Sequence, residues 1–268
     1  MSVMTFGDVR VSYELRGAGD PIIMIMGSAA GGQAWHMHQV PALVDAGYQV
    51  VTFDNRGIGA NATAEPFTID DLVADTAGLI EHLDLGPCRV VGTSMGGYVA
   101  QELALARPEL VRQAVFMASR ARKDAIRNAL SRAEAELYDS GIELPVSYRA
   151  AVRAMQTLSP RTLDDDRAVR DWLDLFELSS APGPGIRHQM ALEAMPDRRP
   201  AYAKISVPCH VVSFADDLIT PPTQGRDLAD AIPGATYEVI ADAGHYGYLE
   251  RPEAVNSSLL TFFGTAGG

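Results

Sequence analysis

The chain alternates between short apolar runs and longer segments with helical periodicity. Residues 9–15 alternate apolar and polar positions, which is typical of an antiparallel edge strand. Continuous apolar runs, typical of strands buried on both faces, occur at 21–26, 49–53, 88–91, 114–117 and 209–214, and a further strand is predicted at 236–240. Helical patterns lie between them, at 35–46, 69–85, 97–107, 223–232 and 252–263. This alternation predicts a mostly parallel sheet with helices on both faces.

One long stretch, residues 120–205, interrupts the alternation. It contains four helical patterns separated by prolines and no strand pattern; the patterns lie at 125–141, 147–158, 163–178 and 185–195. Because strands resume after it, the stretch is predicted to be a helical cap inserted into one α/β domain. The predicted core then consists of residues 1–119 and 206–268.

The composition narrows the class of protein. At 268 residues, with 47% hydrophobic and 21% charged residues, the chain fits one soluble α/β domain with an insertion. A net charge of −12 disfavours nucleic acid and anionic membranes as partners. The first residues lack a secretion signal, and no apolar run reaches membrane-spanning length. We therefore expect a cytoplasmic protein that acts on a small molecule.

The two cysteines, Cys88 and Cys209, both lie in apolar strand-like runs. Their spacing matches neither a disulfide framework nor a zinc site, so both are predicted to be buried as small hydrophobic residues. No metal site is expected.

The clearest candidate chemistry is a G-x-S-x-G motif at 92–96, centred on Ser94. An apolar run at 88–91 precedes it, and a helical pattern at 97–107 follows. A strand–turn–helix context is what a nucleophile elbow requires, because the serine occupies a strained turn and its neighbouring glycines let the chain pass closely. Ser94 is therefore predicted to be a nucleophile.

A serine hydroxyl needs a base to take its proton and a third group to orient that base. Asp216 and Asp217 directly follow the predicted strand at 209–214, and His245 follows the strand at 236–240. Both positions lie beyond the carboxyl end of a predicted parallel strand, where open α/β sheets place their sites. His245 is predicted to be the general base, because none of the other five histidines follows a strand in this order.

With Ser, Asp and His in this order, the chain resembles the α/β-hydrolase fold over nearly its whole length. Segments 26–28 and 54–59 are further signposts of that fold. Segments 35–41, 133–141 and 214–217 resemble its cofactor-free haloperoxidase branch, which is perhydrolase-like and often labelled non-haem bromoperoxidase. The resemblance implies an eight-stranded, mostly parallel sheet with a cap after the sixth strand. It also implies a serine hydrolase without a cofactor, with peracid formation from carboxylic acids and peroxide as a side activity.

The acid of the triad has two candidates. In the family, the acid usually lies four residues before a proline, which selects Asp217 ahead of Pro221. Counting from Ser213, the last small residue of the strand, favours Asp216 instead. We prefer Asp217.

The resemblance also implies an oxyanion hole made of two backbone N–H groups, those of Ser28 and Met95. Here the chain departs from many relatives, which carry His-Gly where this sequence has Met26-Gly27. The polar stretch at 54–57 is interpreted as a structural turn, with Arg56 bonded to carbonyls or a carboxylate nearby.

The cap is expected to cover the pocket and set specificity, with Trp35, Tyr138, Trp172 and Phe176 as substrate-binding residues. The leading functional hypothesis is hydrolysis of a small ester or thioester through an acyl-enzyme on Ser94. A lyase, cyclase or acyl transferase of small-molecule biosynthesis could use the same pocket. A ligand-binding receptor on a hydrolase scaffold is the third interpretation.

Overall fold

Eight strands form a single sheet in the computed structural model of the chain, which describes residues 2–6, 9–63, 65–178, 185–192 and 195–264. The strands are β1 (Ser2–Phe6), β2 (Val9–Arg16), β3 (Asp20–Ile25), β4 (Tyr48–Phe53), β5 (Cys88–Thr93), β6 (Val111–Met117), β7 (Cys209–Phe214) and β8 (Thr236–Ile240). Their order is β1-β2-β4-β3-β5-β6-β7-β8. β2 pairs antiparallel with β1 and β4, and the remaining pairs are parallel. The predicted eight-stranded, mostly parallel sheet is confirmed.

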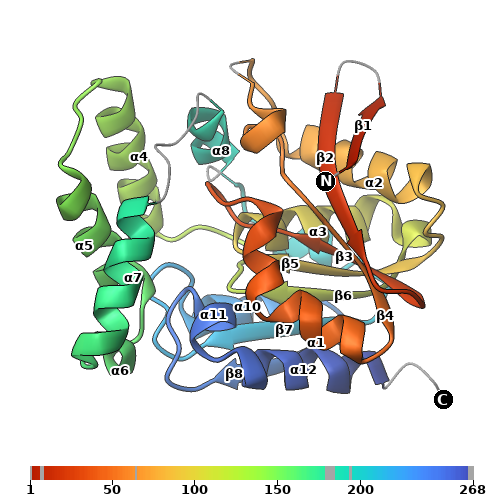
Figure 1. Cartoon of the computed structure of the whole chain (residues 1–268). Coiled ribbons are helices and arrows are strands. Elements are labelled where there is room, and N and C mark those ends of the chain that lie inside the picture. The colour runs from red at the N-terminus through yellow and green to blue at the C-terminus, as the bar shows by residue number, and fades with distance from the viewer. Residues whose placement is uncertain (1, 7–8, 64, 179–184, 193–194, 265–268) are drawn as a thin grey trace.

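Helices cover both faces of the sheet, as Figure 1 shows. One face carries α2 (Ile69–His82), α3 (Met95–Ala106) and α10 (Pro222–Ala231), and the other carries α1 (Gln39–Asp45) and α12 (Pro252–Gly264). In β3, Ile23 and Ile25 belong to the first core, whereas Ile22 and Met24 belong to the second. Successive side chains of a strand point to opposite faces, so a strand between two cores must be apolar at every position.

Two elements differ from the prediction at the amino-terminal end. β1, which no sequence pattern indicated, pairs with β2 from Ser2 opposite Tyr13. The helix predicted at 35–46 is divided into η1 (Gly32–Met37) and α1. The division falls at His38, whose φ of −142° is incompatible with a continuous helix.

Among the described residues, six helices lie between β6 and β7, and we keep the name cap for them. They are α4 (Ala125–Asp139), α5 (Val146–Thr157), α6 (Pro160–Leu163), α7 (Asp166–Leu178), α8 (Ile186–Leu192) and α9 (Arg199–Tyr202). No strand occurs among the described residues of this stretch. Figure 1 shows α4 to α7 gathered beside the sheet, with α8 between them and the core. The exact limits 120 and 205 stay a prediction.

One cap helix departs from the sequence pattern. In the pattern at 163–178, Leu163 is the last residue of α6, and α7 begins at Asp166, because the carboxylate of Asp165 accepts the backbone N–H groups of Arg167 and Ala168 and so starts a new helix. Of the pattern at 185–195, α8 covers Ile186–Leu192, and residues 193–194 lie outside the described part of the chain.

A buried ion pair attaches the end of the cap to the core. The guanidinium of Arg198 donates to both carboxylate oxygens of Glu102 in α3, at 2.8 and 2.6 Å. The hydroxyl of Tyr202 donates to the same carboxylate at 2.8 Å. Because the side chain of Glu102 is only 9% exposed, its charge depends on these partners for compensation.

Replacing Arg198 with methionine is expected to lower the free energy of unfolding by about 2–3 kcal/mol, because the carboxylate of Glu102 would keep its burial and lose its counter-charge. Urea denaturation measures the loss. The control is Arg107→Met, which removes an exposed pair with Glu81 and Glu109 and is expected to cost less than about 1 kcal/mol. Equal losses in the two variants would contradict the role given to the buried pair.

Candidate active site

Ser94 occupies a strained turn between the central strand β5 and helix α3. Its φ is +54°, a left-handed conformation that non-glycine residues rarely adopt. The N–H of Ser94 donates to the carbonyl of Met117 on neighbouring β6 at 3.0 Å. A Cβ on Gly96 would lie 2.2 Å from the carbonyl oxygen of Ile25, so only glycine fits there. The local structure is therefore that of the predicted elbow.

The structure brings Ser94, His245 and Asp217 into one hydrogen-bonded row. Ser94 Oγ lies 3.1 Å from His245 Nε2, and His245 Nδ1 lies 2.8 Å from Asp217 Oδ2. His245 and Asp217 are buried. Of the two acid candidates, Asp217 makes this contact with its carboxylate. The backbone N–H of Asp216 donates to the carbonyl of Ala243 at 2.9 Å and so ties the two loops together.

The carboxylate of Asp217 is held from several directions. Oδ1 accepts the N–H groups of Ile219 and Thr220, and Oδ2 accepts the hydroxyl of Thr220 at 2.6 Å as well as His245. Burial by itself would raise the pKa of Asp217, but the charge of His245 and the hydrogen bonds from His245 and Thr220 outweigh it and hold the pKa below its ordinary value. Asp217 is therefore ionised at neutral pH and fixed in one orientation toward His245.

Glu250 anchors the loop that carries His245 to the cap. One of its carboxylate oxygens accepts the N–H of Gly244 at 2.7 Å. The other accepts the N–H and hydroxyl of Ser159, and the hydroxyl of Thr162. These four bonds join the His245 loop to the start of α6.

The loop that follows β3, residues 26–31, is anchored to the cap by Gln189. The carboxamide oxygen of Gln189 accepts the N–H of Ala29 at 2.9 Å, and its nitrogen donates to the carbonyl of Arg56 at 2.9 Å. Gln189 lies on α8 and is fully buried. On the core side, Asn55 Nδ2 donates to the carbonyl of Met26 at 2.7 Å. Sequence reasoning missed Gln189, since a single glutamine in a helical pattern carries no signal.

The polar stretch at 54–57 is structural, as predicted. Both Arg56 Nε and Nη2 donate to the carboxylate of Asp75, at 2.9 and 2.7 Å. Asp54 Oδ1 accepts the N–H of Gly32 at 2.9 Å. Arg56 thus joins the loop after β4 to α2, and Asp54 joins it to the start of η1.

A cleft opens in front of Ser94, with about 740 Å³ of empty space that is partly open to solvent. Its lining includes Ser28, Ser94, His245 and Tyr246, and the cap contributes residues of α4 and Thr157 of α5. Ser28, predicted for the oxyanion hole, therefore lies at the cleft beside Ser94. Met95 lines a second cavity instead.

The four side chains expected to bind substrate are not among the described residues that line the cleft. Trp35 is fully buried in the sheet core, 5.0 Å from the ring of Tyr248. Trp172 and Phe176 pack within the cap against α5, because the apolar face of α7 turns toward that helix. Tyr138 is 37% exposed near the end of α4. Apolar periodicity in the cap thus marks its own small core.

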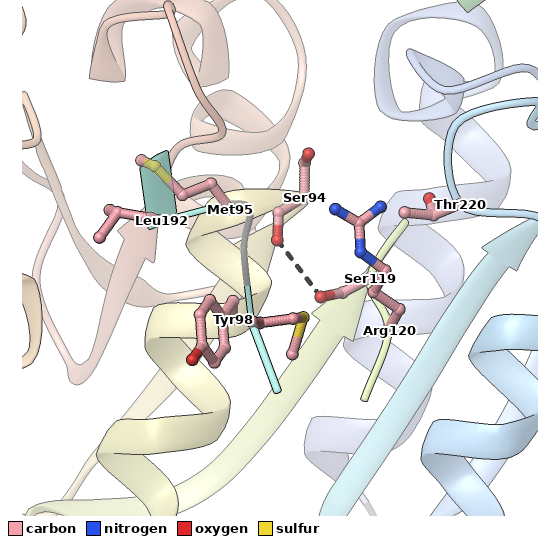
Figure 2. Close-up of a pocket in the computed structure, with 8 residues that line it drawn as sticks. Ser94, Met95, Tyr98, Ser119, Arg120, Leu192 and Thr220 are labelled. Carbon is pink, nitrogen blue, oxygen red and sulfur yellow. Dashed lines mark hydrogen bonds between the residues drawn. The ribbon is translucent and has the colours of Figure 1, made fainter. Parts of the chain in front are cut away.

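A second, smaller cavity with about 330 Å³ of empty space also reaches Ser94, as Figure 2 shows. Ser119 donates to the carbonyl of Ser94 at 3.2 Å, and the guanidinium of Arg120 lies between Ser94 and Thr220. Arg120 is 6% exposed. A buried cation here adds positive potential on this side of the nucleophile.

Other chemistry is limited within the described residues. Cys88 and Cys209 are buried and unpaired thiols, and burial raises the pKa of each to about 12. No group of three or more His, Cys, Asp or Glu side chains that could hold a metal occurs among the described residues. Within the same residues, no helix is long and apolar enough to cross a membrane.

Residues 17–258 match the alpha/beta hydrolase family, and the chain belongs to that family. The protein named "Putative non-heme bromoperoxidase BpoC" from Mycobacterium tuberculosis is 51% identical over 256 residues, which cover 95% of this chain and 98% of that protein. Its crystal structure gives a TM-score of 0.95 at 49% identity and covers 99% of this chain and 98% of that one. The predicted resemblance to the haloperoxidase branch is confirmed.

More distant relatives carry other hydrolase names. The "3-oxoadipate enol-lactonase 2" of Acinetobacter baylyi is 30% identical over 257 residues, which cover 96% of this chain and 94% of that protein. The family is thus one of hydrolases with different substrates, and general hydrolase activity follows for this chain.

Replacing Gln189 with leucine removes both hydrogen bonds to the two loops while keeping the size of the side chain. We expect a fluorophosphonate to label Ser94 about 10- to 100-fold more slowly, because the β3 loop would lose its fixed position. Intact-mass spectrometry against time measures the rate. The control on the same helix is Arg187→Gln, which removes a surface pair with Asp139. Unchanged labelling of Gln189→Leu beside a lowered melting temperature would reduce Gln189 to a purely structural residue.

Proposed function

We propose that the protein is a serine hydrolase that cleaves a small carboxylic ester or thioester through an acyl-enzyme on Ser94. The observation that carries the proposal is the row of hydrogen bonds from Ser94 through His245 to Asp217, with the serine at the wall of a cleft. A serine nucleophile, an imidazole base and a carboxylate in contact are the parts that acyl transfer requires.

The first step is attack of Ser94 Oγ on the substrate carbonyl. His245 Nδ1 faces the ionised carboxylate of Asp217, which favours the tautomer with its proton on Nδ1. The lone pair of Nε2 then faces Ser94 Oγ and accepts its proton as the C–O bond forms. Asp217 stabilises the resulting imidazolium and keeps its own charge.

The tetrahedral intermediate needs hydrogen-bond donors for its oxyanion. In the proposed mechanism these are the N–H groups of Ser28 and Met95. Met95 is the first residue of α3, so its N–H has no acceptor within the helix and lies at the positive end of the helix dipole. The hydroxyl of Ser28 is also buried and makes no hydrogen bond among the described residues, which adds a third donor beside the nucleophile.

The remaining steps follow from proton transfer. The imidazolium of His245 protonates the leaving alcohol or thiol, which leaves an acyl group on Ser94. Water then attacks the acyl group and gives a proton to His245, and His245 passes that proton to Ser94 Oγ as the bond to the acyl group breaks and the carboxylic acid leaves. Hydrogen peroxide in place of that water would release a peracid, and the bromoperoxidase name of the 51% identical relative supports this side activity.

Ser94→Ala is expected to lower turnover of 4-nitrophenyl esters at least about 10³-fold, because no acyl-enzyme can form. The assay is run with esters of rising chain length, beside circular dichroism to confirm the fold and fluorophosphonate labelling followed by mass. Retained turnover in a folded Ser94→Ala variant would overturn the acyl-enzyme mechanism and indicate base-only chemistry at His245.

The two neighbouring aspartates provide a matched pair of variants. Asp217→Asn is expected to lower kcat about 10²- to 10⁴-fold, because the amide no longer selects the productive tautomer of His245. Asp216→Asn changes the same charge one residue away and is expected to stay within about twofold. The pair is compared by kcat on one ester. A larger loss in Asp216→Asn would reverse the assignment of the acid.

A further inference from the structure

The cap side of the cleft is polar and comes from one face of α4, together with Thr157 at the end of α5. Arg127, Ser131 and Glu134 line the cleft there. Their spacing of four and three residues places them on the same side of the helix. The described part of α4 adds no apolar side chain to the cleft wall. A purely hydrocarbon substrate would therefore leave this wall without a matching surface.

Hydrogen-bond donors dominate this wall. Nε of Arg127 is buried, and no acceptor for it occurs among the described residues. Lys123 Nζ donates to Ser131 Oγ at 2.8 Å, so the hydroxyl proton of Ser131 is left for another acceptor. A buried cationic donor without an acceptor is costly, and a ligand that supplies one removes that cost.

Tyr246, which follows His245 in the chain and also lines the cleft, likewise carries a hydrogen-bond donor that is bonded to a cation. Its hydroxyl oxygen accepts both Nε and Nη2 of Arg153, at 3.0 and 2.5 Å. With both lone pairs occupied, the hydroxyl can only donate. Arg127, Ser131 and Tyr246 thus all line the cleft, and each carries a donor that either is cationic or is bonded to a cation.

The charge balance of the cleft also differs from that of the whole protein. The chain has 34 acidic and 22 basic residues, yet the α4 residues that line the cleft include one cation, Arg127, and one carboxylate, Glu134, with Lys123 bonded to Ser131 beside them. The carboxylate of Asp124 at the start of α4 is engaged by the N–H of Arg127 and by Gln224. Glu134 is exposed, so solvent screens its charge, whereas the guanidinium of Arg127 is partly buried. The inner part of this wall therefore favours an anion.

We infer that the substrate is an ester that bears a free carboxylate, held by Arg127 while Ser94 attacks the ester carbonyl. The inference rests on the proposed function and specifies its substrate class. Arg127 binds the carboxylate through charge-assisted hydrogen bonds, and the hydroxyls of Ser131 and Tyr246 supply further donors. The carboxylate can belong to the acyl part or to the leaving group of the ester, and both forms present the same anion to the wall.

The test compares matched esters that differ by one charge. On the acyl side the pair is the 4-nitrophenyl monoester of glutaric acid and 4-nitrophenyl pentanoate, with spontaneous hydrolysis subtracted. On the leaving-group side the pair is 4-acetoxybenzoate and 4-acetoxybenzamide. The wild-type protein is expected to favour the anionic member of at least one pair by about 10-fold or more in kcat/KM, and that pair identifies which part carries the carboxylate.

Arg127→Gln is expected to remove this preference, with kcat/KM falling about 10- to 100-fold more for the anionic ester than for its neutral partner. Arg127→Lys, which keeps the charge but not the forked donors, is expected to retain part of it. The control is Arg132→Gln on the same helix, whose side chain is 75% exposed and pairs with Glu136. Equal losses on both esters, or a preference that survives in Arg127→Gln, would overturn the inference while Ser94-dependent turnover of the neutral ester still supports the hydrolase.

A second measurement does not depend on turnover. Fluorophosphonate labelling of Ser94 is followed in the presence of glutaric acid monoamide or glutaric diamide, which differ by one charge. In the wild-type and Arg132→Gln proteins, the monoamide is expected to slow labelling at a concentration about 10-fold lower than the diamide requires. In Arg127→Gln, the two amides are expected to slow labelling at the same concentration. Equal protection by the two amides in the wild-type protein would overturn the inference. Absence of any labelling would instead refute the proposed nucleophile.

Discussion

The left-handed turn at Ser94 is the constraint on which the rest of the structure depends. A non-glycine residue with a φ of +54° costs about 1–3 kcal/mol, so the surrounding structure must hold it in place. β5 lies in the interior of the sheet, its residues are all buried, and the N–H of Ser94 is bonded to β6. Residues 95–104 of α3 are buried as well. Fully buried elements of the sheet and of α3 thus hold this strained residue in place.

The other two members of the row lie on loops, and the cap helps to position the site around them. Glu250 ties the His245 loop to α6, and Gln189 ties the β3 loop to α8. Both contacts join short cap helices to loops that follow strands of the sheet. Loops of this kind have few backbone partners of their own, so side chains from elsewhere must supply them. The cap is consequently part of the framework of the site as well as its cover.

The sequence predicts the core of the sheet and the three side chains that meet at Ser94, because both leave strong local patterns. Strands buried on two faces read as continuous apolar runs, and the elbow requires glycines at fixed spacing around Ser94. The choice between Asp216 and Asp217 needed three-dimensional information, since adjacent residues of a loop differ only in direction. In the structure the Asp217 carboxylate points to His245. The direction of a side chain in a loop follows no repeating pattern in the sequence.

The residues that line the cleft on its cap side were harder to predict, for a different reason. Trp172 and Phe176 follow a helical apolar period, and in the structure they pack in the small cap core and against Tyr246, and are not among the described residues that line the cleft. The residues that do face the cleft on α4 are polar and sit among other polar residues, as on any solvated helix. Only the orientation of the whole helix distinguishes Arg127 from Arg132, and that orientation is a tertiary property.

These contacts have a consequence for exchanging caps between relatives. A transplanted cap would bring its own α4 face into the cleft and so alter which molecules are accepted. It would also remove Gln189, Ser159 and Thr162, the side chains through which α8 and α6 meet the core loops. A chimera that changes α4 but keeps Gln189, Ser159 and Thr162 can acquire a new specificity while the β3 loop and the His245 loop keep their positions. A chimera that loses these three side chains would cover the site but leave the two loops without their anchors.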